Sequence, residues 1–247
     1  MNSFANLRDV ADGLPTGTIL PGMLLRSDAP LSRDEPPVAV SWPPAAVVDL
    51  RHPLEKSEEH PLTGLSVVHE LSLVDPTAPG PGGPRAEGPL GDFYASLLEP
   101  APAAMLVRVV DAVAAAPGPM LIHCLAGKDR TGVAVALLLR LLGVPVADIV
   151  DEYLLTNLAA PRLAERLRLH YSLLDAPTRD AELVTVSSVA APRALVETVL
   201  AHWDAHPDGP RGWYLEHGGE TAVIAELERR LTGQRLAASG GSGAVGA

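Results

Sequence analysis

Cysteine is almost absent from this chain, since Cys124 is the only one in 247 residues. A lone cysteine cannot form an intrachain disulfide, so nothing argues for an oxidising compartment. Long hydrophobic runs are missing as well: the uncharged apolar stretch Thr131–Leu139, for example, is far too short to cross a bilayer. Met1–Asp12 is mixed and polar, unlike a cleavable signal. We therefore expect no membrane insertion and a cytoplasmic location, with export that needs no cleavable signal left open.

Positive charge is also scarce. The chain has 19 lysine and arginine residues against 30 aspartate and glutamate residues, a formal net charge of −11. This balance repels nucleic acid and anionic membranes in general. An acidic ligand must therefore bind in a local basic pocket, for which Lys128 and Arg130 are the first candidates. We expect Arg8, Arg26 and Arg51 to bind structural carboxylates instead.

Aromatic residues make up only 4% of the chain, whereas 47% of it is hydrophobic. A chain of this length can bury one large core without disulfides, and we expect a single α/β domain over residues 1–235. Residues 236–247 include a Gly/Ser-rich run and are predicted to form a flexible tail. Residues 75–91 hold five prolines and five glycines, which predicts an irregular exposed loop.

Apolar periodicity, with proline as punctuation, predicts the regular elements. The short run Met120–His123 is typical of a buried strand, and the alternating run Leu65–Val74 of a second strand. Thr131–Leu142 is apolar on nearly every side, which predicts a central helix. The other predicted helices are Pro102–Ala116, Val146–Leu158, Arg162–Leu174, Pro192–His206 and Thr221–Leu231.

The most informative segment is His123–Gly132, with the sequence HCLAGKDRTG. It places Cys124 six positions before Arg130, in a loop that joins a strand to the first turn of a helix. Unpaired N–H groups and the positive end of the helix dipole can hold a dianionic phosphate there. The same field favours a thiolate over a thiol. The segment therefore predicts a phosphate site with a reactive cysteine.

Each residue of this loop can be given a role. Cys124 is the predicted nucleophile, because a thiolate is the reactive form of cysteine. Arg130 can clamp two phosphate oxygens with its planar fork, which lysine cannot do. Thr131 can donate its hydroxyl to the sulfur. His123 either orients the loop by hydrogen bonding or is a satisfied core histidine.

The remaining loop residues are expected to complete the cradle. Backbone groups of Leu125, Ala126 and Gly127 bind phosphate, and Gly127 permits a close approach and unusual backbone angles. Lys128 is expected to place a movable positive charge at the mouth. Asp129 lies beside it, where a carboxylate facing a dianion is repelled unless it is protonated or paired with Lys128.

Competing interpretations of the loop explain less of it. A buried cysteine is usually a small hydrophobe, but that leaves the Gly-Lys-Asp-Arg-Thr-Gly cluster unexplained. An ATP-binding P-loop needs Gly-x4-Gly-Lys-[Ser/Thr], and Ile122 and Asp129 occupy the two discriminating positions. A rhodanese-like sulfur carrier also uses a cysteine in a cradle of backbone amides, but its chemistry does not require the run Lys-Asp-Arg-Thr. A phosphate chemistry therefore fits best.

With these residues the chain resembles the bacterial protein tyrosine phosphatases that carry His-Cys-x-Ala-Gly-Lys-Asp-Arg-Thr-Gly, a family that includes tyrosine/serine and lipid phosphatases. The resemblance implies one α/β phosphatase domain, with a central, mostly parallel sheet flanked by helices. It also implies hydrolysis of phosphomonoesters through a phosphocysteine, without metal or cofactor. Shorter family-like pieces are Asn6–Val10, Leu25–Ser27, Val48–Arg51, Asp151–Asn157 and Trp213–Leu215.

Hydrolysis also needs a proton for the departing oxygen. In similar phosphatases an aspartate that opens the loop after a strand serves as general acid, and Asp75 stands in that position after Leu65–Val74. Asp75 is our first candidate and Asp129 the second. An ordinary strand-ending turn at Asp75-Pro76 is the alternative that the sequence leaves open.

Substrate and partners follow from the same resemblance. A phosphotyrosine protein or peptide is the expected substrate, with phosphoserine/threonine and phosphoinositides as further candidates, and the oligomeric state is open. The scarcity of aromatic residues predicts a shallow mouth. Alternatives are a phosphate-binding module without turnover, an inositol-phosphate phosphatase of the same superfamily and a sulfur carrier. His202 and His206 are spaced like metal ligands but have no third ligand, so we expect a surface pair.

Overall fold

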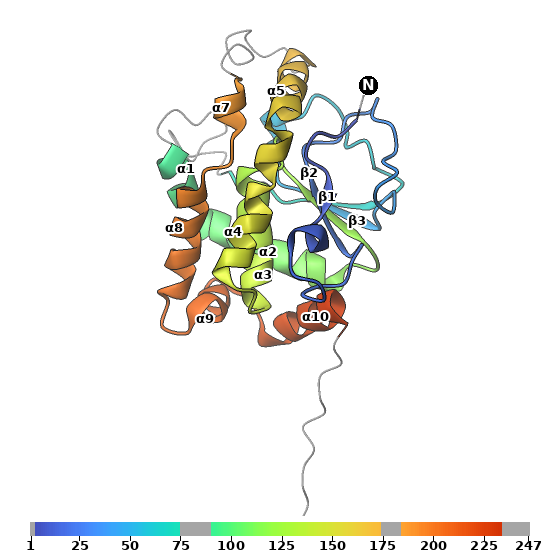
Figure 1. Ribbon diagram of the computed structural model, residues 1–247. Helices are drawn as coiled ribbons and strands as arrows, with labels where there is room; N and C mark the ends of the chain where they lie inside the picture. Colours follow the sequence, from blue (N-terminus) through green and yellow to red (C-terminus); the bar gives the residue numbers. More distant parts are fainter. Residues whose placement is uncertain (1–2, 75–89, 174–183, 234–247) are drawn as a thin grey trace, which may run out of the picture.

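A computed structural model gives the fold and describes residues 3–74, 90–173 and 184–233 (Figure 1). Its centre is one sheet in the strand order β1-β2-β5-β3-β4. The strands are Arg8–Asp9 (β1), Leu24–Ser27 (β2), Ala46–Asp49 (β3), Val67–Glu70 (β4) and Met120–His123 (β5). β1 is antiparallel to β2 and the other pairs are parallel. The α/β class with a mostly parallel sheet is therefore confirmed.

The register of the three central strands positions the site. Ser27 of β2 and Asp49 of β3 both lie opposite His123, the last residue of β5. Because these strands are parallel, their carboxyl ends meet at one edge of the sheet. The segments that follow these strands, including the loop after His123, must therefore lie close together.

Helices make up most of the rest of the described chain (Figure 1). The α-helices are Leu90–Ser96 (α1), Pro100–Ala115 (α2), Asp129–Leu141 (α3), Val146–Leu154 (α4), Thr156–Leu173 (α5), Val186–Val189 (α7), Arg193–Asp204 (α8), Gly209–Glu216 (α9) and Thr221–Thr232 (α10). Two 3-10 helices precede them, Val10–Gly13 (η1) and Pro53–Glu55 (η2). Within the described ranges, no helix is long and apolar enough to cross a membrane.

The two faces of the sheet bury different partners. Alternate strand residues such as Val48 and Ile122 pack into the large core with the helices, whereas Val47 and Leu121 belong to a smaller cluster on the other face. The smaller cluster is completed by residues from irregular segments, including Leu62. This period of two is what a pleated strand imposes. The helices accordingly gather on one side of the sheet in Figure 1.

Helix α3 is the central helix that its composition predicts. All of its residues from Arg130 to Leu139 are buried, as is Leu141. It follows directly from β5 and its loop, so its first turn lies at the carboxyl edge of the sheet. It begins at Asp129, two residues earlier than predicted, which brings Arg130 into the first turn.

Other boundaries differ from the sequence-based prediction. The strand predicted over Leu65–Val74 is reduced to β4, because its partner β3 ends at Asp49 and the final backbone bond runs from Leu71 N–H to the Asp49 carbonyl. The helix predicted over Val146–Leu158 is divided between α4 and α5. Helix α5 starts before Pro161 and continues through it. Burial of its apolar face outweighs the one backbone bond that proline removes.

The predicted loop over residues 75–91 is only partly within the described residues, and its last two belong to α1. Residues 75–89, which include the candidate acid Asp75, lie outside the described residues. So does the predicted tail, residues 236–247. Helices α1, α7 and α9 were not predicted, because short helices carry little periodic signal.

Candidate active site

Residues 124–128 of the motif form the turn between β5 and α3, and Cys124 is the first residue of this turn. The thiol is free and only 2% exposed. It lies on the wall of a cavity of about 220 Å³ that opens at the carboxyl edge of the sheet. The cavity is lined by Glu55, Phe93, Cys124, Leu125, Ala126, Lys128, Asp129, Arg130, Leu167, Tyr171, Val184, Ser188 and Val189.

The carbonyl groups of the four residues 124–127 are each held by a donor from outside the loop. The donors come from β5, from the chain after β2, from the N-terminal segment and from β2. They are His123 Nδ1 to Cys124 O (3.0 Å), Ala29 N to Leu125 O (3.0 Å), Asn6 Nδ2 to Ala126 O and Gly127 O (3.1 Å each) and Arg26 Nη2 to Gly127 O (2.8 Å).

This arrangement orients the N–H groups of the loop. In a trans peptide the N–H points opposite to the carbonyl, so outward carbonyls turn the next N–H groups, those of residues 125–128, toward the interior of the loop. Within the described chain these four N–H groups donate to no protein acceptor. Consecutive inward N–H groups at the start of a helix form a concave binding site for an anion.

Gly127 is required by its backbone conformation. Its φ is +64°, and a Cβ at this position would lie 2.1 Å from the carbonyl oxygen of Ser27. The predicted unusual backbone angles are therefore confirmed. The close approach that excludes a side chain is to the end of β2, so the glycine lets the loop pack against the sheet edge.

Arg130 is bound by a carboxylate that the sequence did not reveal. Its Nη1 and Nη2 atoms donate to the two oxygens of Glu55 at 2.5 and 2.6 Å, and Nη1 also donates to the Leu50 carbonyl at 3.3 Å. To clamp a phosphate, Arg130 must therefore use the N–H groups that do not bind Glu55, or the phosphate must displace Glu55. Glu55 lies 75 residues before Arg130 and in no recognisable motif, so no local signal could have identified it.

The Arg130–Glu55 pair is ionised and held in place. Burial alone would lower the pKa of Arg130, but Glu55, Cys124 and Asp129 raise it above its ordinary value. Burial alone would raise the pKa of Glu55, and Arg130 holds it below its ordinary value. The Glu55 carboxylate also accepts the His52 N–H at 2.7 Å, which fixes it on η2. The fork of Arg130 is thus preorganised at the cavity wall.

Lys128 does not provide the movable charge predicted for it. Its Nζ donates to the carbonyls of Ser188 (3.1 Å) and Ala190 (3.3 Å), and the residue is buried. These carbonyls lie at the end of α7, where unpaired helix carbonyls attract a cation. Lys128 therefore attaches α7 to the loop. Its Nζ is also 3.5 Å from Asp129 Oδ2, the pairing considered for these neighbours.

Asp129 is held by a tyrosine as well. Its Oδ1 accepts a hydrogen bond from the Tyr94 hydroxyl at 2.7 Å, and that hydroxyl is 2.7 Å from the hydroxyl of Tyr153. Burial, followed by the charge of Asp129, raises the pKa of Tyr94 well above its usual value. Tyr94 is therefore a protonated donor. Its bond orients the Asp129 carboxylate beside the cavity.

Thr131 differs from its prediction. Its hydroxyl is fully buried and has no hydrogen-bond partner among the described residues, so the predicted bond to the Cys124 sulfur is absent. Because α3 begins at Asp129, Thr131 is wound into the first turn and covered by the core.

The predicted structural roles of three arginines are confirmed: Arg8 and Arg26 pair with Glu152, and Arg51 with Asp49.

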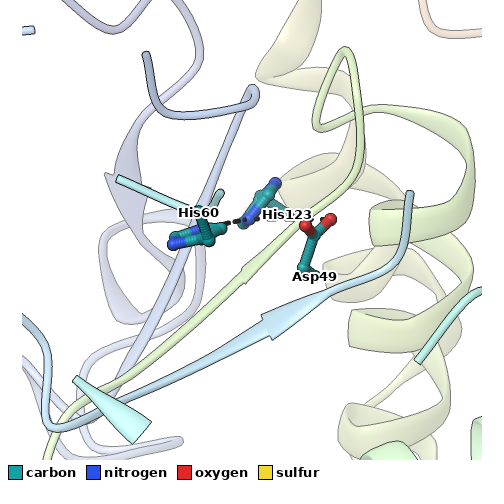
Figure 2. A group of neighbouring side chains, drawn as sticks. All are labelled: Asp49, His60 and His123. Atoms are coloured by element: carbon teal, nitrogen blue, oxygen red, sulfur yellow. Dashed lines mark hydrogen bonds and ion pairs between the residues drawn. The ribbon is translucent and has the colours of Figure 1, made fainter. Parts of the chain in front are cut away.

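The two histidines considered for a metal are on the surface. His202 is exposed, and His206 Nε2 lies 2.7 Å from a carboxylate oxygen of Glu216. A different group, Asp49, His60 and His123, places possible metal ligands within 4.8 Å of one another beneath the loop (Figure 2). Asp49, however, is paired with Arg51 at 2.9 Å and with Lys56 at 3.2 Å.

The buried histidines predict a loss of stability in acid. Burial lowers the pKa of His60 to about 4 and that of His123 to about 3. The unfolded chain, with pKa values near 6.5, binds more protons below that pH. The free energy of unfolding must therefore fall as the pH drops from 6.5 toward 4, by at most about 1.4 kcal/mol per pH unit for each histidine.

Urea unfolding of the wild type and of His60→Gln between pH 6.5 and 4.5 measures this loss. We expect the slope of the unfolding free energy against pH to decrease in the variant by about one proton, whatever its absolute stability. Asp49, whose pKa lies well below its ordinary value, adds its own loss only near and below pH 4. An unchanged slope in His60→Gln would contradict a neutral, buried His60.

Comparison with known proteins adds to this geometry. A model of the tyrosine phosphatase family matches residues 1–233. Over 62 residues, 25% of this chain and 22% of the relative, the chain is 48% identical to the triple specificity protein phosphatase PtpB of Mycobacterium tuberculosis (strain ATCC 25618 / H37Rv). Over 36 residues, 15% of this chain and 12% of the relative, it is 61% identical to a tyrosine-protein phosphatase of Nostoc commune. The chain thus spans less than a quarter of these curated relatives.

Proposed function

The chain belongs to the tyrosine phosphatase family, and we propose that it hydrolyses phosphomonoesters through a phosphocysteine intermediate. The observation that carries the proposal is the turn after β5, where the carbonyls of residues 124–127 are all held outward around a buried cysteine. We propose residues 1–235 as the catalytic domain.

In this mechanism the phosphate of the substrate binds to the N–H groups of residues 125–128. Cys124 attacks the phosphorus as a thiolate, and the ester oxygen leaves with a proton from a general acid. Water then attacks the phosphocysteine, the thiolate departs, and the same acid, now a base, accepts the proton of the water. Arg130 stabilises the charge on the phosphate oxygens in both steps.

The general acid is proposed from its position in the chain. Asp75 follows the segment after β4, whose neighbour β3 ends at the same sheet edge as β5, although Asp75 itself lies outside the described residues. Asp129 remains the second candidate. Its engagement by Tyr94 and Lys128 supports a positioning role more than proton transfer.

Asp75→Asn should separate these candidates. An aryl ester with a good leaving group barely needs a proton, whereas a tyrosyl or alkyl ester does. We expect Asp75→Asn to slow a tyrosyl phosphate by about 10²-fold or more while affecting p-nitrophenyl phosphate far less, and to flatten the basic limb of the pH–rate curve. Steady-state kinetics on both esters, with Asp129→Asn as the matched variant, measures this. If only Asp129→Asn shows the asymmetry, the assignment is wrong.

The substrate class is proposed from the walls of the cavity. Phe93 and Tyr171 both line it, so the mouth is more aromatic than the composition predicted. Aromatic walls favour an aryl ester, and we propose phosphotyrosine protein or peptide as the main substrate. The name of the mycobacterial relative, a triple specificity protein phosphatase, supports a range wider than one substrate type. We propose phosphoserine/threonine and phosphoinositides as the further candidates. Lys128 is buried and hydrogen-bonded to two carbonyls, so it is less available than expected to bind a second phosphate group of a phosphoinositide.

A further inference from the structure

A second histidine lies behind the loop. His60 is in the segment between η2 and β4, is 5% exposed and contacts the ring of His123 (Figure 2). Its Nε2 is 2.9 Å from His123 Nε2. His123 ends β5 and its Nδ1 is 3.0 Å from the Cys124 carbonyl. The two rings therefore form a chain that ends on the backbone of the cysteine.

The hydrogen bonds determine where each ring carries its proton. The Leu62 N–H donates to His60 Nδ1 at 3.1 Å, so this nitrogen has no proton. A neutral His60 must then be protonated at Nε2 and donate to His123 Nε2. With Nε2 as an acceptor, a neutral His123 carries its proton on Nδ1, where it donates to the Cys124 carbonyl. Only this order of protons satisfies all three bonds.

Both rings are neutral at ordinary pH. Burial lowers the pKa of His60, and Arg51 and Lys56 lower it further, while Asp49 and Glu70 oppose them. Burial also lowers the pKa of His123, with Arg51 and His60 acting in the same direction, against Asp49 and the Cys124 carbonyl. A neutral ring can adopt either tautomer, so the tautomer must be selected by its neighbours.

Asp49 is the neighbour that favours the wrong tautomer. Its Oδ1 is 3.8 Å from His123 Nε2, too far for a hydrogen bond in this structure but close enough to attract a proton on that nitrogen. A proton on Nε2 would remove the one on Nδ1, and the Cys124 carbonyl would lose its donor. The N–H of His60 opposes this, because it already occupies Nε2.

We propose that His60 is a positioning residue that selects the Nδ1-protonated tautomer of His123 and thereby fixes the Cys124 carbonyl outside the phosphate cradle. The proposal rests on the proposed function of Cys124 as nucleophile, since it explains how the loop is held for that role. A metal bound by His60, His123 and Asp49 fits less well. The Nε2 atoms of the two histidines share a hydrogen bond, and the Asp49 carboxylate is paired with Arg51 and Lys56.

The first test observes the tautomer. Ring-nitrogen NMR of the ¹⁵N-histidine-labelled wild type should show His123 protonated at Nδ1 and bare at Nε2. In His60→Leu the proton of His123 should move to Nε2 or exchange between both nitrogens. In His60→Gln, whose amide N–H can replace the Nε2–H donor, it should remain on Nδ1. A wild-type His123 protonated at Nε2 would overturn the proposal. This result comes from the wild type alone, so it does not depend on whether a variant folds.

The second test observes the cysteine. The midpoint pH for alkylation of Cys124 by iodoacetamide should rise by about one unit in His60→Leu, with much smaller change in His60→Gln. His202→Leu, at an exposed position on α8, is the matched control and should leave the midpoint unchanged. Equal midpoints in the wild type and in a folded His60→Leu would contradict the proposal.

Activity gives the last readout. If the proposed function holds, His60→Leu should lower kcat on p-nitrophenyl phosphate by about tenfold to a hundredfold with little change in KM, and His60→Gln should restore most of it. A His60→Leu loss that His60→Gln does not restore would indicate only structural damage and would contradict a positioning role. Wild-type protein without phosphatase activity would refute the proposed function, while the spectra and alkylation would still test His60.

Discussion

Cys124→Ser is expected to lose essentially all turnover while it keeps its affinity for phosphate. The serine hydroxyl has nearly the size of the thiol but is not ionised at neutral pH, so the attack on phosphorus stops. The N–H groups of residues 125–128 are set by carbonyl bonds to His123, Ala29 and Asn6, none of which involves the sulfur. The phosphate cradle should therefore remain.

We expect kcat to fall by about 10⁴-fold or more in Cys124→Ser, with the dissociation constant of inorganic phosphate changed by less than about threefold. Steady-state kinetics with a metal chelator present and calorimetric titration with phosphate measure the two quantities. Unchanged circular dichroism would show that the fold is retained. Hydrolysis by Cys124→Ser at a normal rate would contradict the mechanism.

Arg130→Lys is expected to weaken both turnover and phosphate binding. The ammonium of lysine is a single point of charge, whereas the guanidinium of Arg130 now binds two oxygens of Glu55 and has further N–H groups for a phosphate. Loss of this fork should lower kcat by about 10²- to 10³-fold, as the removal of a preorganised donor does elsewhere, and weaken phosphate affinity as well.

Two variants control for effects on the fold. Arg140→Lys makes the same change on the same helix, at an arginine that pairs with Asp204 away from the cavity, and should retain activity. Glu55→Gln keeps the shape of the group that holds Arg130 but removes its charge, so a smaller loss is expected. Kinetics of all three variants on one substrate compare them. An Arg130→Lys enzyme as active as Arg140→Lys would contradict the clamp.

The parts of the site that sequence predicted correctly are local. The strand Met120–His123, the loop and the buried helix behind it are contiguous, and their residue types carry the signal without help from the rest of the chain. The positive φ of Gly127 follows from the same segment. Such a segment constrains its own backbone, so its position at the sheet edge could be predicted as well.

The parts that sequence missed depend on contacts between distant segments. Glu55 and His60 come from the chain between β3 and β4, and nothing in their neighbourhood indicates that they face Arg130 and His123. Lys128 was expected to be movable, whereas two carbonyls near α7 hold it in place. These partners are backbone groups, which leave no trace in composition. Only the tertiary fold brings these groups together.

Helix boundaries show the same division. Helix α10 was predicted to within one residue at its end, since its apolar period is strong and Gly233 stops it in the left-handed conformation. The start of α5 was misplaced because proline usually marks a first turn, and here Pro161 lies inside the helix. Packing of Leu163 and Leu167 overrides that local preference.

Trapping of the phosphoenzyme tests the central proposal most directly. The wild type is mixed with an aryl phosphate, quenched within milliseconds and digested, and the peptides are weighed by mass spectrometry. The mechanism predicts one added phosphoryl group on the peptide that contains Cys124, more of it in Asp75→Asn if that residue activates the water, and none in Cys124→Ser. Turnover at the normal rate with phosphate on another residue, or on no residue at any quench time, would contradict it.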